Sequence, residues 1–295
     1  GARLGPGCAL HDRQFIVAVD VLGSPGREGV INGASAVTVD QIHLLFHDQI
    51  TVLRKTVWDR ESARVVTTVA EIFGAIQLSI RNCPADDEEA VNALLLAVLA
   101  SPDLDILPWS DVARQFQARV AFLSRISPER QLPDISNSAL SGTLSEWLAP
   151  VMTGMRSAAD LKKLDMLAAI RSVFTWEQLH LIEQGAPTHI EVPSGSRLRI
   201  DYTNTEPCVS VKLQEMFGLE ETPRIAWGMV TLIIHLLSPA QRPIQVTRDL
   251  RSVWETTYPL VKKELKGRYP KHPWPDDPWH AVPTGRTKKG SSRPQ

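Results

Sequence analysis

The residues best suited to binding chemistry lie in one stretch near the end of the sequence. Between residues 262 and 279, basic side chains alternate with aromatic rings and prolines. Cations neutralise phosphates and aromatic faces stack on unpaired bases, so this composition is typical of contacts with single-stranded nucleic acid. The candidate contact residues in this stretch are Lys262, Lys263, Lys266, Arg268, Tyr269, Lys271, His272 and Trp274.

A structural interpretation of the same stretch is open, and composition alone favours it. Basic side chains stabilise the C-terminal end of a helix, and the prolines that follow can stiffen a strap whose tryptophans pack on the domain. A third interpretation makes the aromatic residues anchors for a protein partner. The anchors in that case are Trp254, Tyr258, Trp274 and Trp279.

Two further basic residues, Arg197 and Arg199, fall on one face of an expected hairpin. Its arms are residues 189–193 and 197–202, and the turn between them contains Ser194 and Gly195. Side chains two apart on a strand share a face, so both arginines can extend a phosphate-binding surface. Glu191 and Asp201 lie near enough in the sequence to form surface ion pairs with them instead, and this alternative stays open.

Motifs for catalysis are missing from the sequence. No segment matches the Gly-x-x-x-x-Gly-Lys-Ser/Thr loop that wraps nucleotide phosphates. The acidic run 86–89 precedes an apolar stretch, as at a helix start, and the turn at Ser194 lacks the nucleophile-elbow pattern and an obvious base. His43 and His47 are four apart but lie in an apolar stretch without further ligands. We therefore expect no catalytic residue, no metal site and no cofactor in this chain.

Length and composition indicate how these residues are positioned. The sequence has 295 residues, 43% hydrophobic and 22% charged, which predicts two or three folded units. Cys8, Cys83 and Cys208 are odd in number and far apart, so we expect no disulfide and a reducing, cytoplasmic setting. No apolar run is long enough to cross a membrane. The sequence begins without Met or a basic-then-apolar leader, so we expect it to start inside a longer gene product.

Changes of periodicity divide the chain into four parts, and an α+β, multidomain fold is predicted. Residues 1–84 are predicted to form an OB-like β unit, a five-stranded barrel with one helix near 40–47, a turn at 23–26 and a hairpin loop at 59–62 between two strands. Residues 85–185 are predicted to be helical. Residues 186–282 are predicted to form an α+β domain with a hairpin and a final helix, and residues 283–295 a disordered basic tail. Residues 261–295 carry nine basic and three acidic side chains, whereas residues 85–183 carry eight and fourteen.

Two helices are predicted in detail. Ser157 and Asp160 resemble a capping box, followed by Leu161, Leu164, Leu167, Ile170 and Phe174 on one apolar face. Near the C-terminal end, Thr247 is expected to cap a final helix that runs through Trp254, Tyr258, Val261 and Leu265. Thr175 is expected to begin the helix between these two, which Gly185 ends.

Five segments together resemble a known family. They read APTHIEVPSGSR at 186–197, LQEMFG at 213–218, LLSPA at 236–240, VTRDL at 246–250 and GRYPKHPWPD at 267–276. This wording and order is similar to the C-terminal domain of HrpB-type bacterial ATP-dependent helicases of the DEAH/RHA-like group. The resemblance covers about 145–290, and the β-rich start resembles the preceding OB-fold segment of the same proteins.

The resemblance implies a parent enzyme with two RecA-like motor domains that use ATP and magnesium. The P-loop, the D-E-x-H box and the arginine-finger motif of such enzymes are absent here, so ATP hydrolysis is not expected of this chain. The expected function is an accessory, nucleic-acid-facing and scaffold part of an RNA helicase. Its expected partners are single-stranded RNA and the motor domains, with no membrane.

Overall fold

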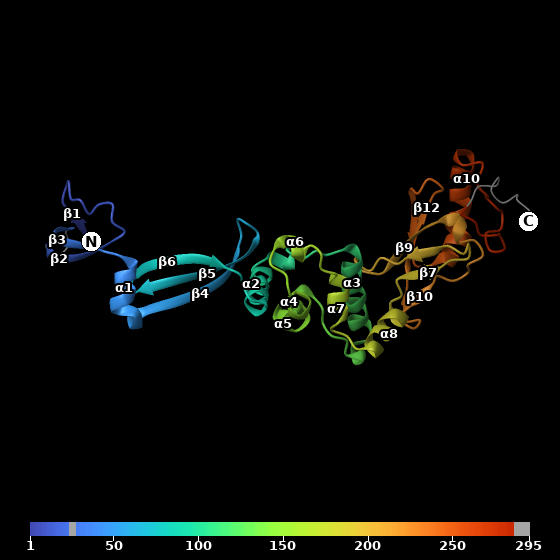
Figure 1. Ribbon diagram of the computed structural model, residues 1–295. Coiled ribbons are helices and arrows are strands. Elements are labelled where there is room, and N and C mark those ends of the chain that lie inside the picture. Colours follow the sequence, from blue (N-terminus) through green and yellow to red (C-terminus); the bar gives the residue numbers. More distant parts are fainter. Residues whose placement is uncertain (24–27, 286–295) are drawn as a thin grey trace, which may run out of the picture. The chain divides into compact units, whose positions relative to one another are not determined.

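The computed structural model describes residues 1–23 and 28–285 (Figure 1). It divides into two compact units, one formed by Gly1–Leu96 with Gly154–Ser157 and the other by Ala97–Thr153 with the chain from Ala158 onward. Both helices and several small sheets are present, which confirms the predicted α+β, multidomain class. Most of the turn expected at 23–26, and the expected basic tail from residue 286 on, lie outside the described residues.

The first unit is mainly β structure. Its elements are β1 (Ala2–Leu4), β2 (Phe15–Leu22), β3 (Gly29–Val37), α1 (Val39–Phe46), β4 (Ile50–Asp59), β5 (Arg64–Phe73) and β6 (Ile76–Cys83), and α2 (Asp87–Leu99) begins in it. The helix expected near 40–47 is confirmed as α1, and Thr38 with Gln41 forms its capping box. The acidic run 86–89 lies at the start of α2, as the helix-start interpretation predicts.

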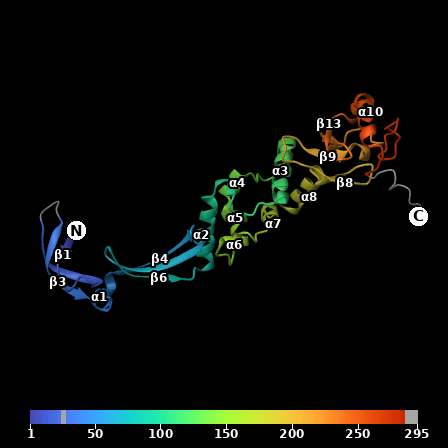
Figure 2. The same cartoon turned by 90° about the horizontal axis from the view of Figure 1, so that it is seen from above.

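The described strands of this unit form two separate three-stranded sheets, not the single five-stranded barrel predicted. One sheet has the order β1-β3-β2 and the other β4-β5-β6 (Figure 2). The reason lies in the connections: β4, β5 and β6 are long strands joined by tight turns, so each pairs with its sequence neighbour. The Asp59 carboxylate accepts from the N–H groups of Glu61 and Ser62 and holds the predicted hairpin loop.

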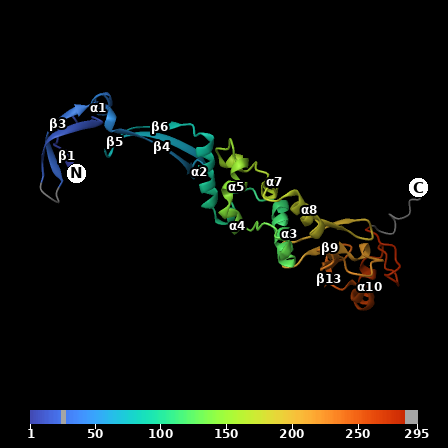
Figure 3. The ribbon, with the colours of Figure 1, turned by 90° about the horizontal axis from the view of Figure 1, so that it is seen from below.

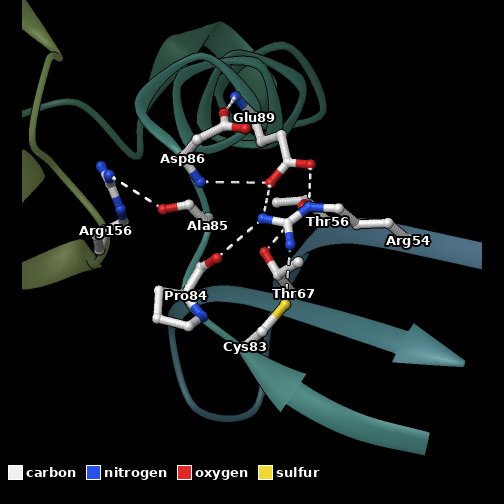
Figure 4. Close-up of polar contacts among 9 residues, drawn as sticks. All are labelled: Arg54, Thr56, Thr67, Cys83, Pro84, Ala85, Asp86, Glu89 and Arg156. Carbon is white, nitrogen blue, oxygen red and sulfur yellow. Dashed lines mark hydrogen bonds and ion pairs between the residues drawn. The ribbon is translucent and has the colours of Figure 1, made fainter.

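An arginine fastens the second sheet to the start of α2 (Figure 4). Arg54 on β4 donates to both carboxylate oxygens of Glu89, at 2.5 and 2.7 Å, and to the carbonyl of Pro84 at 2.9 Å. Its remaining terminal nitrogen lies 3.1 Å from Cys83 Sγ. The forked hydrogen bond lowers the pKa of Glu89 to about 2 and raises that of Arg54. We call this arrangement the Arg54 clasp.

Arg156 makes a second connection within the same unit. Its guanidinium donates to Asp87 Oδ1 at 2.6 Å and to the carbonyl of Ala85 at 3.4 Å (Figure 4). The Arg156 carbonyl accepts from the N–H of Val65 at 2.7 Å, which joins residues 154–157 to the edge of β5. The start of α2 is thus held by two arginines from segments far apart in the sequence.

The second unit begins with short helices. They are α3 (Asp111–Ile126), α4 (Asn137–Gly142), α5 (Leu144–Trp147), α6 (Ala158–Leu161), α7 (Met166–Arg171) and α8 (Trp176–Gly185). Ser110 caps α3, whose buried face carries Ala113, Phe116, Val120 and Leu123 at helical spacing. Thr175 and Gln178 form the capping box of α8, so the predicted start and end of this helix are confirmed.

The apolar face predicted from Leu161 to Phe174 belongs to two helices, not one. Helix α6 ends at Leu161, and the Asp165 side chain accepts from the N–H of Ala168 to cap a new helix, α7. An aspartate at such a position satisfies a free N–H and starts a helix in a new direction. Leu161, Ile170 and Phe174 are all buried, so the pattern marked core residues correctly while missing the break.

Strands return after α8. They are β7 (His189–Glu191), β8 (Arg197–Arg199), β9 (Cys208–Lys212), β10 (Arg224–Ile225), β11 (Val230–Thr231), β12 (Ile233–Leu237) and β13 (Pro243–Thr247). β7 and β8 form the predicted hairpin, and β9, β12 and β13 form a sheet of order β13-β12-β9. In this sheet β12 runs parallel to β9 and antiparallel to β13.

The final helical segment consists of α9 (Leu250–Ser252), a π-helical turn (Val253–Thr257) and α10 (Tyr258–Arg268). Helix α10 lies near strands β9 and β13 (Figure 3). The cap of the segment is Asp249, whose carboxylate accepts from the N–H of Ser252, so the expectation that Thr247 caps the helix is wrong. The Thr247 hydroxyl instead bonds the backbone of Asp249. Pro259 has no N–H to donate one turn back, which accounts for the widened turn just before it.

Candidate nucleic-acid interface

A strap of residues 270–279 follows α10 and packs on the domain. Trp274 is only 7% exposed, and its indole N–H donates to the carbonyl of Tyr269 at 3.0 Å. The Tyr258 hydroxyl donates to the carbonyl of Pro275 at 2.8 Å, and the N–H of Gly218 donates to that of Pro278 at 3.0 Å. The strap is therefore fixed along its length, and in this arrangement the Trp274 ring faces the domain interior.

The aromatic residues of the final helical segment also lie in the core. Phe217, Trp254 and Tyr258 form a mutual cluster with ring centroids 5.7 to 5.8 Å apart, and all three are buried. The Trp254 indole donates to the carbonyl of Leu219 at 2.8 Å. Burial raises the pKa of Tyr258 above its ordinary value. Since Trp254, Tyr258 and Trp274 are buried, they do not form the exposed anchor for a protein partner considered above.

Lys262 is occupied by the strap. Its ammonium donates to the carbonyl of Pro275 at 2.8 Å and pairs with Asp276, and its side chain is 16% exposed. The hydrogen bond from Lys262 lowers the pKa of Asp276, which keeps this carboxyl ionised. Lys262 therefore holds the strap and is not displayed to an external phosphate.

Four other cations near the end of α10 remain open to solvent. Lys263, Lys266, Arg268 and Lys271 are exposed, and none of them forms an ion pair with another residue in the described ranges. Lys263 and Lys266 are three apart on the helix and therefore lie on neighbouring positions of one face. We call these four residues the α10 cations.

Tyr269 and His272 lie between the helix and the strap. Their rings are 6.3 Å apart and nearly perpendicular, and both residues are half-buried. His272 Nδ1 lies 3.2 Å from Gln214 Oε1, and burial together with the charge of Lys212 lowers the pKa of His272. At neutral pH this histidine is uncharged and adds no cation to the surface.

The hairpin arginines are exposed and unpaired. Arg197 lies directly opposite Glu191 and Arg199 opposite His189, yet neither arginine makes an ion pair within the described residues. Asp201 instead accepts from Gln115, Thr203 and Asn204. The described residues therefore contain no ion pair between these arginines and Glu191 or Asp201.

The turn between β7 and β8 has a partner that the sequence did not reveal. The Ser194 hydroxyl donates to Glu215 Oε2 at 3.1 Å, and Glu215 is buried. The two residues are 21 positions apart, so no local pattern links them. No histidine contacts this pair among the described residues, and the hydrogen bond anchors the turn.

A strongly exposed aromatic residue was missed by the sequence analysis. Trp176, the first residue of α8, is 74% exposed, and its ring stacks on His180 with centroids 5.5 Å apart and planes within 3°. The available signal was the position directly after the capping residue Thr175, where a side chain on the first turn can point outward. A flat, solvent-exposed ring pair of this kind suits stacking by an unpaired base.

Two further classes of function depend on clusters of metal-ligating side chains and on long apolar helices. Within 1–23 and 28–285, no three His, Cys, Asp or Glu side chains gather as metal ligands, and no helix is long and apolar enough for a membrane span. His43 lies 3.3 Å from Glu71, and Cys8, Cys83 and Cys208 are all free thiols.

The fold and these residues can be compared with known proteins. Residues 147–278 match the family model for the ATP-dependent helicase C-terminal domain of HrpB. Over 293 residues the chain is 35% identical to the ATP-dependent RNA helicase HrpB of Escherichia coli strain K12. Residues 147–278 thus carry the HrpB-type C-terminal domain, and the chain as a whole is similar to part of HrpB. The chain covers 36% of that relative's length, while 99% of the chain is aligned.

Solved structures of HrpB are also similar to this chain. The crystal structure of the E. coli DExH-box NTPase HrpB matches 97% of this chain with a TM-score of 0.66 and 34% identity. A crystal structure of the E. coli DEAH/RHA helicase HrpB matches 93% with a TM-score of 0.60 and 30% identity. In these comparisons the chain spans 36% and 34% of the HrpB chains. The resemblance inferred from the five sequence segments is confirmed.

Proposed function

We propose that this chain is the RNA-facing accessory and scaffold part of an HrpB-type ATP-dependent helicase. The HrpB match and the absence of a P-loop from this sequence support an accessory role. ATP, magnesium and the motor domains belong, in this proposal, to the remainder of the protein. The boundaries at 84, 185 and 282 and the cytoplasmic setting are parts of the same proposal.

One observation carries the RNA-facing role: the basic residues of the second unit fall into two classes. The strap binds Lys262, whereas the α10 cations and the hairpin arginines form no ion pair among the described residues, and the charge of Lys266 contributes to lowering the pKa of Asp276. Unpaired, exposed cations repel one another unless a polyanion or salt compensates them. The proposed phosphate contacts are therefore Arg197, Arg199 and the α10 cations, with Tyr269 and Trp176 as aromatic neighbours of the bound strand.

The test is a salt titration with single-stranded RNA that carries a 5′-hydroxyl. Each phosphate contact contributes about −0.7 to the slope of log affinity against log salt. Replacing Arg268 and Lys271 together by Gln should flatten that slope by about 1.4. The matched control is the double replacement of Arg248 and Arg251 by Gln, because these arginines pair with Glu206 and Glu255. Equal slopes in both variants would reject the proposed contacts.

Stacking is tested separately at Trp176. Trp176→Ala should weaken RNA binding by about 1–3 kcal/mol with an unchanged salt slope, because a ring carries no charge. Circular dichroism and melting should be those of the wild type, since the ring is exposed. An unchanged affinity would remove Trp176 from the interface.

Docking onto the rest of the helicase is a second candidate, and strand β2 favours it. Val17, Val19 and Val21 of β2 are all exposed, and the pairing of β2 with β3 is irregular between Ala18 and Val21. A row of exposed valines is a common mark of a covered surface in the complete protein. If a well-folded chain shows no detectable RNA binding, or RNA binding that does not depend on salt, docking is the function.

A further inference from the structure

A cavity of about 360 Å³ in the second unit is lined by both arginines and apolar side chains. Its charged lining contains Arg119 on α3, Arg171 at the end of α7 and Arg199 on β8, with the single carboxylate Glu183 from α8. Its apolar lining, which we call the apolar wall, contains Val112, Phe116, Leu167 and Ile200. This volume lies at the small end of the range for sites that hold small ligands.

The arginines are held in place before any ligand arrives. Arg119 is 4% exposed, and its Nε donates to the carbonyl of Ala186 at 2.6 Å while one terminal nitrogen donates to Glu183 Oε2 at 2.8 Å. Glu183 Oε1 lies 3.6 Å from Arg171 Nη1. Both guanidinium groups lie within 6 Å of the Phe116 ring centroid, at 5.9 and 5.5 Å. Preorganised guanidinium groups suit the planar, two-pronged recognition of phosphate oxygens.

Donors in this cavity remain unused. Arg119 Nη1 keeps access to solvent and makes no hydrogen bond with a described residue. Arg199 has no ion pair in the described ranges, and His189 bonds Thr188 through Nδ1, which leaves Nε2 without a protein partner there. Asp201 lies in the adjoining cavity, and its oxygens already accept from Gln115, Thr203 and Asn204.

The charge count of the lining selects the ligand. Three arginines against one glutamate leave two positive charges in the lining of this cavity, while Asp111 and Asp201 line the adjoining cavity together with Arg199. A phosphate monoester carries a charge of about −1.5 to −2 at pH 7, whereas an internal phosphodiester or a carboxylate carries only −1. The larger cavity nearby, of about 660 Å³, lacks this excess because Arg114 is its lone arginine and already bonds Gln117 and Asn137.

We propose that the cavity between α3, α7, α8 and β8 binds a phosphate monoester with a compact apolar or heteroaromatic body, such as a nucleoside monophosphate. The phosphate lies among Arg119, Arg171 and Arg199, and the body lies against the apolar wall. The ligand can be a free nucleotide or the phosphorylated end of an RNA strand, which present the same group. Arg199 is shared with the proposed RNA surface, whereas the α10 cations take no part in the lining of this cavity.

The test is calorimetric titration of the whole chain with AMP, with adenosine as the ligand that lacks phosphate. We expect one site for AMP and none for adenosine. Arg171→Gln and Arg199→Gln should each weaken AMP binding about tenfold or more, as the loss of a charged hydrogen bond predicts. Arg251→Gln removes an equal charge from α9, outside the cavity, and should leave AMP affinity unchanged.

A melting curve of each variant checks that it is folded. Arg199→Gln is not expected to disturb the fold, because Arg199 is exposed on the hairpin. Replacement of all four α10 cations by Gln should leave AMP binding intact, so failure of this site and failure of the proposed RNA surface are distinguishable. No AMP binding by a folded wild type, equal binding of adenosine, or full AMP affinity in both Arg171→Gln and Arg199→Gln would overturn the proposal.

The two ligand sources are separated by RNA strands of one sequence with a 5′-phosphate or a 5′-hydroxyl. A gain from the 5′-phosphate that disappears in Arg171→Gln supports the site and assigns it to strand ends. AMP binding that is sensitive to Arg171→Gln, without any gain from the 5′-phosphate on the strand, supports the site and assigns it to the free nucleotide.

Discussion

The Arg54 clasp and the α10 cations both consist of basic side chains, but the first is bound within the protein and the second are exposed to solvent. In the clasp, every nitrogen of the Arg54 guanidinium faces a carboxylate, carbonyl or thiol of its own unit. At the end of α10, Lys262 is bound in this way, while Lys263, Lys266, Arg268 and Lys271 form no ion pair among residues 1–23 and 28–285. A saturated cation holds the fold together, and an unsaturated one is available to a ligand.

The difference shows why counts of basic residues are a poor guide to binding. Lys262 and Lys263 are neighbours in the sequence and identical in type, yet one points at the strap and the other at solvent. Helical geometry separates adjacent residues by about 100°, so neighbours face different surroundings. The partner of each cation, not its position in a basic run, decides its role.

The largest expected effect distinguishes a core ring from an exposed one. Trp274→Ala should reduce the free energy of unfolding by about 3–5 kcal/mol, the usual cost of removing a buried aromatic side chain. Trp176→Ala should change it by less than about 0.5 kcal/mol, as surface substitutions do. Denaturant unfolding followed by circular dichroism checks both. Equal losses in the two variants would contradict the assignment of Trp274 to the core.

The next effect separates a saturated lysine from an open one. Lys262→Met should reduce the free energy of unfolding by about 1–3 kcal/mol, because charged hydrogen bonds to the strap are lost, and should leave the RNA salt slope unchanged. Lys266→Gln should leave the melting temperature unchanged and reduce the salt slope of RNA binding by about 0.7. A slope change in Lys262→Met without a loss of stability would show that the contrast between the two lysines is false.

A smaller effect is expected at the Arg54 clasp, because Arg54 and Glu89 are partly exposed and solvent screens their attraction. The pKa of Glu89 is lowered to about 2 from an ordinary value of 4.5. Its contribution to stability is therefore complete above about pH 4.5 and is lost as the pH falls towards 2. The melting difference between wild type and Glu89→Gln should shrink over that window. A difference that stays constant from pH 6 to pH 2 would exclude the clasp as its source.

The smallest expected effect concerns the thiols. Cys8, Cys83 and Cys208 are all free, so a reducing agent should leave the melting temperature unchanged. Melting scans with and without reductant check this expectation. A large fall on reduction would mean that one of these cysteines takes part in a disulfide.

Local signals predicted much of the secondary structure. The strand and turn around Asp59, the capping residue Thr175 and the hairpin at Ser194 all depend on neighbours within a few positions, and all three were predicted. The errors lie where two local signals compete. Thr247 and Asp249 can both cap a helix, and the tertiary position of the chain selected Asp249. Asp165 interrupted an apolar period that otherwise continues from Leu161 to Phe174.

The sequence by itself determined the family, the α+β class and the identity of the candidate cations, because motif wording and periodicity are properties of consecutive residues. Only the tertiary structure decided which cations are free. Arg54 meets Glu89 across 35 positions, Ser194 meets Glu215 across 21, and Arg119 and Arg199 line one cavity although 80 residues separate them. Whether a charged side chain has a partner depends on distances in space. Folding brings together residues that are far apart in the sequence, and the sequence does not show these contacts.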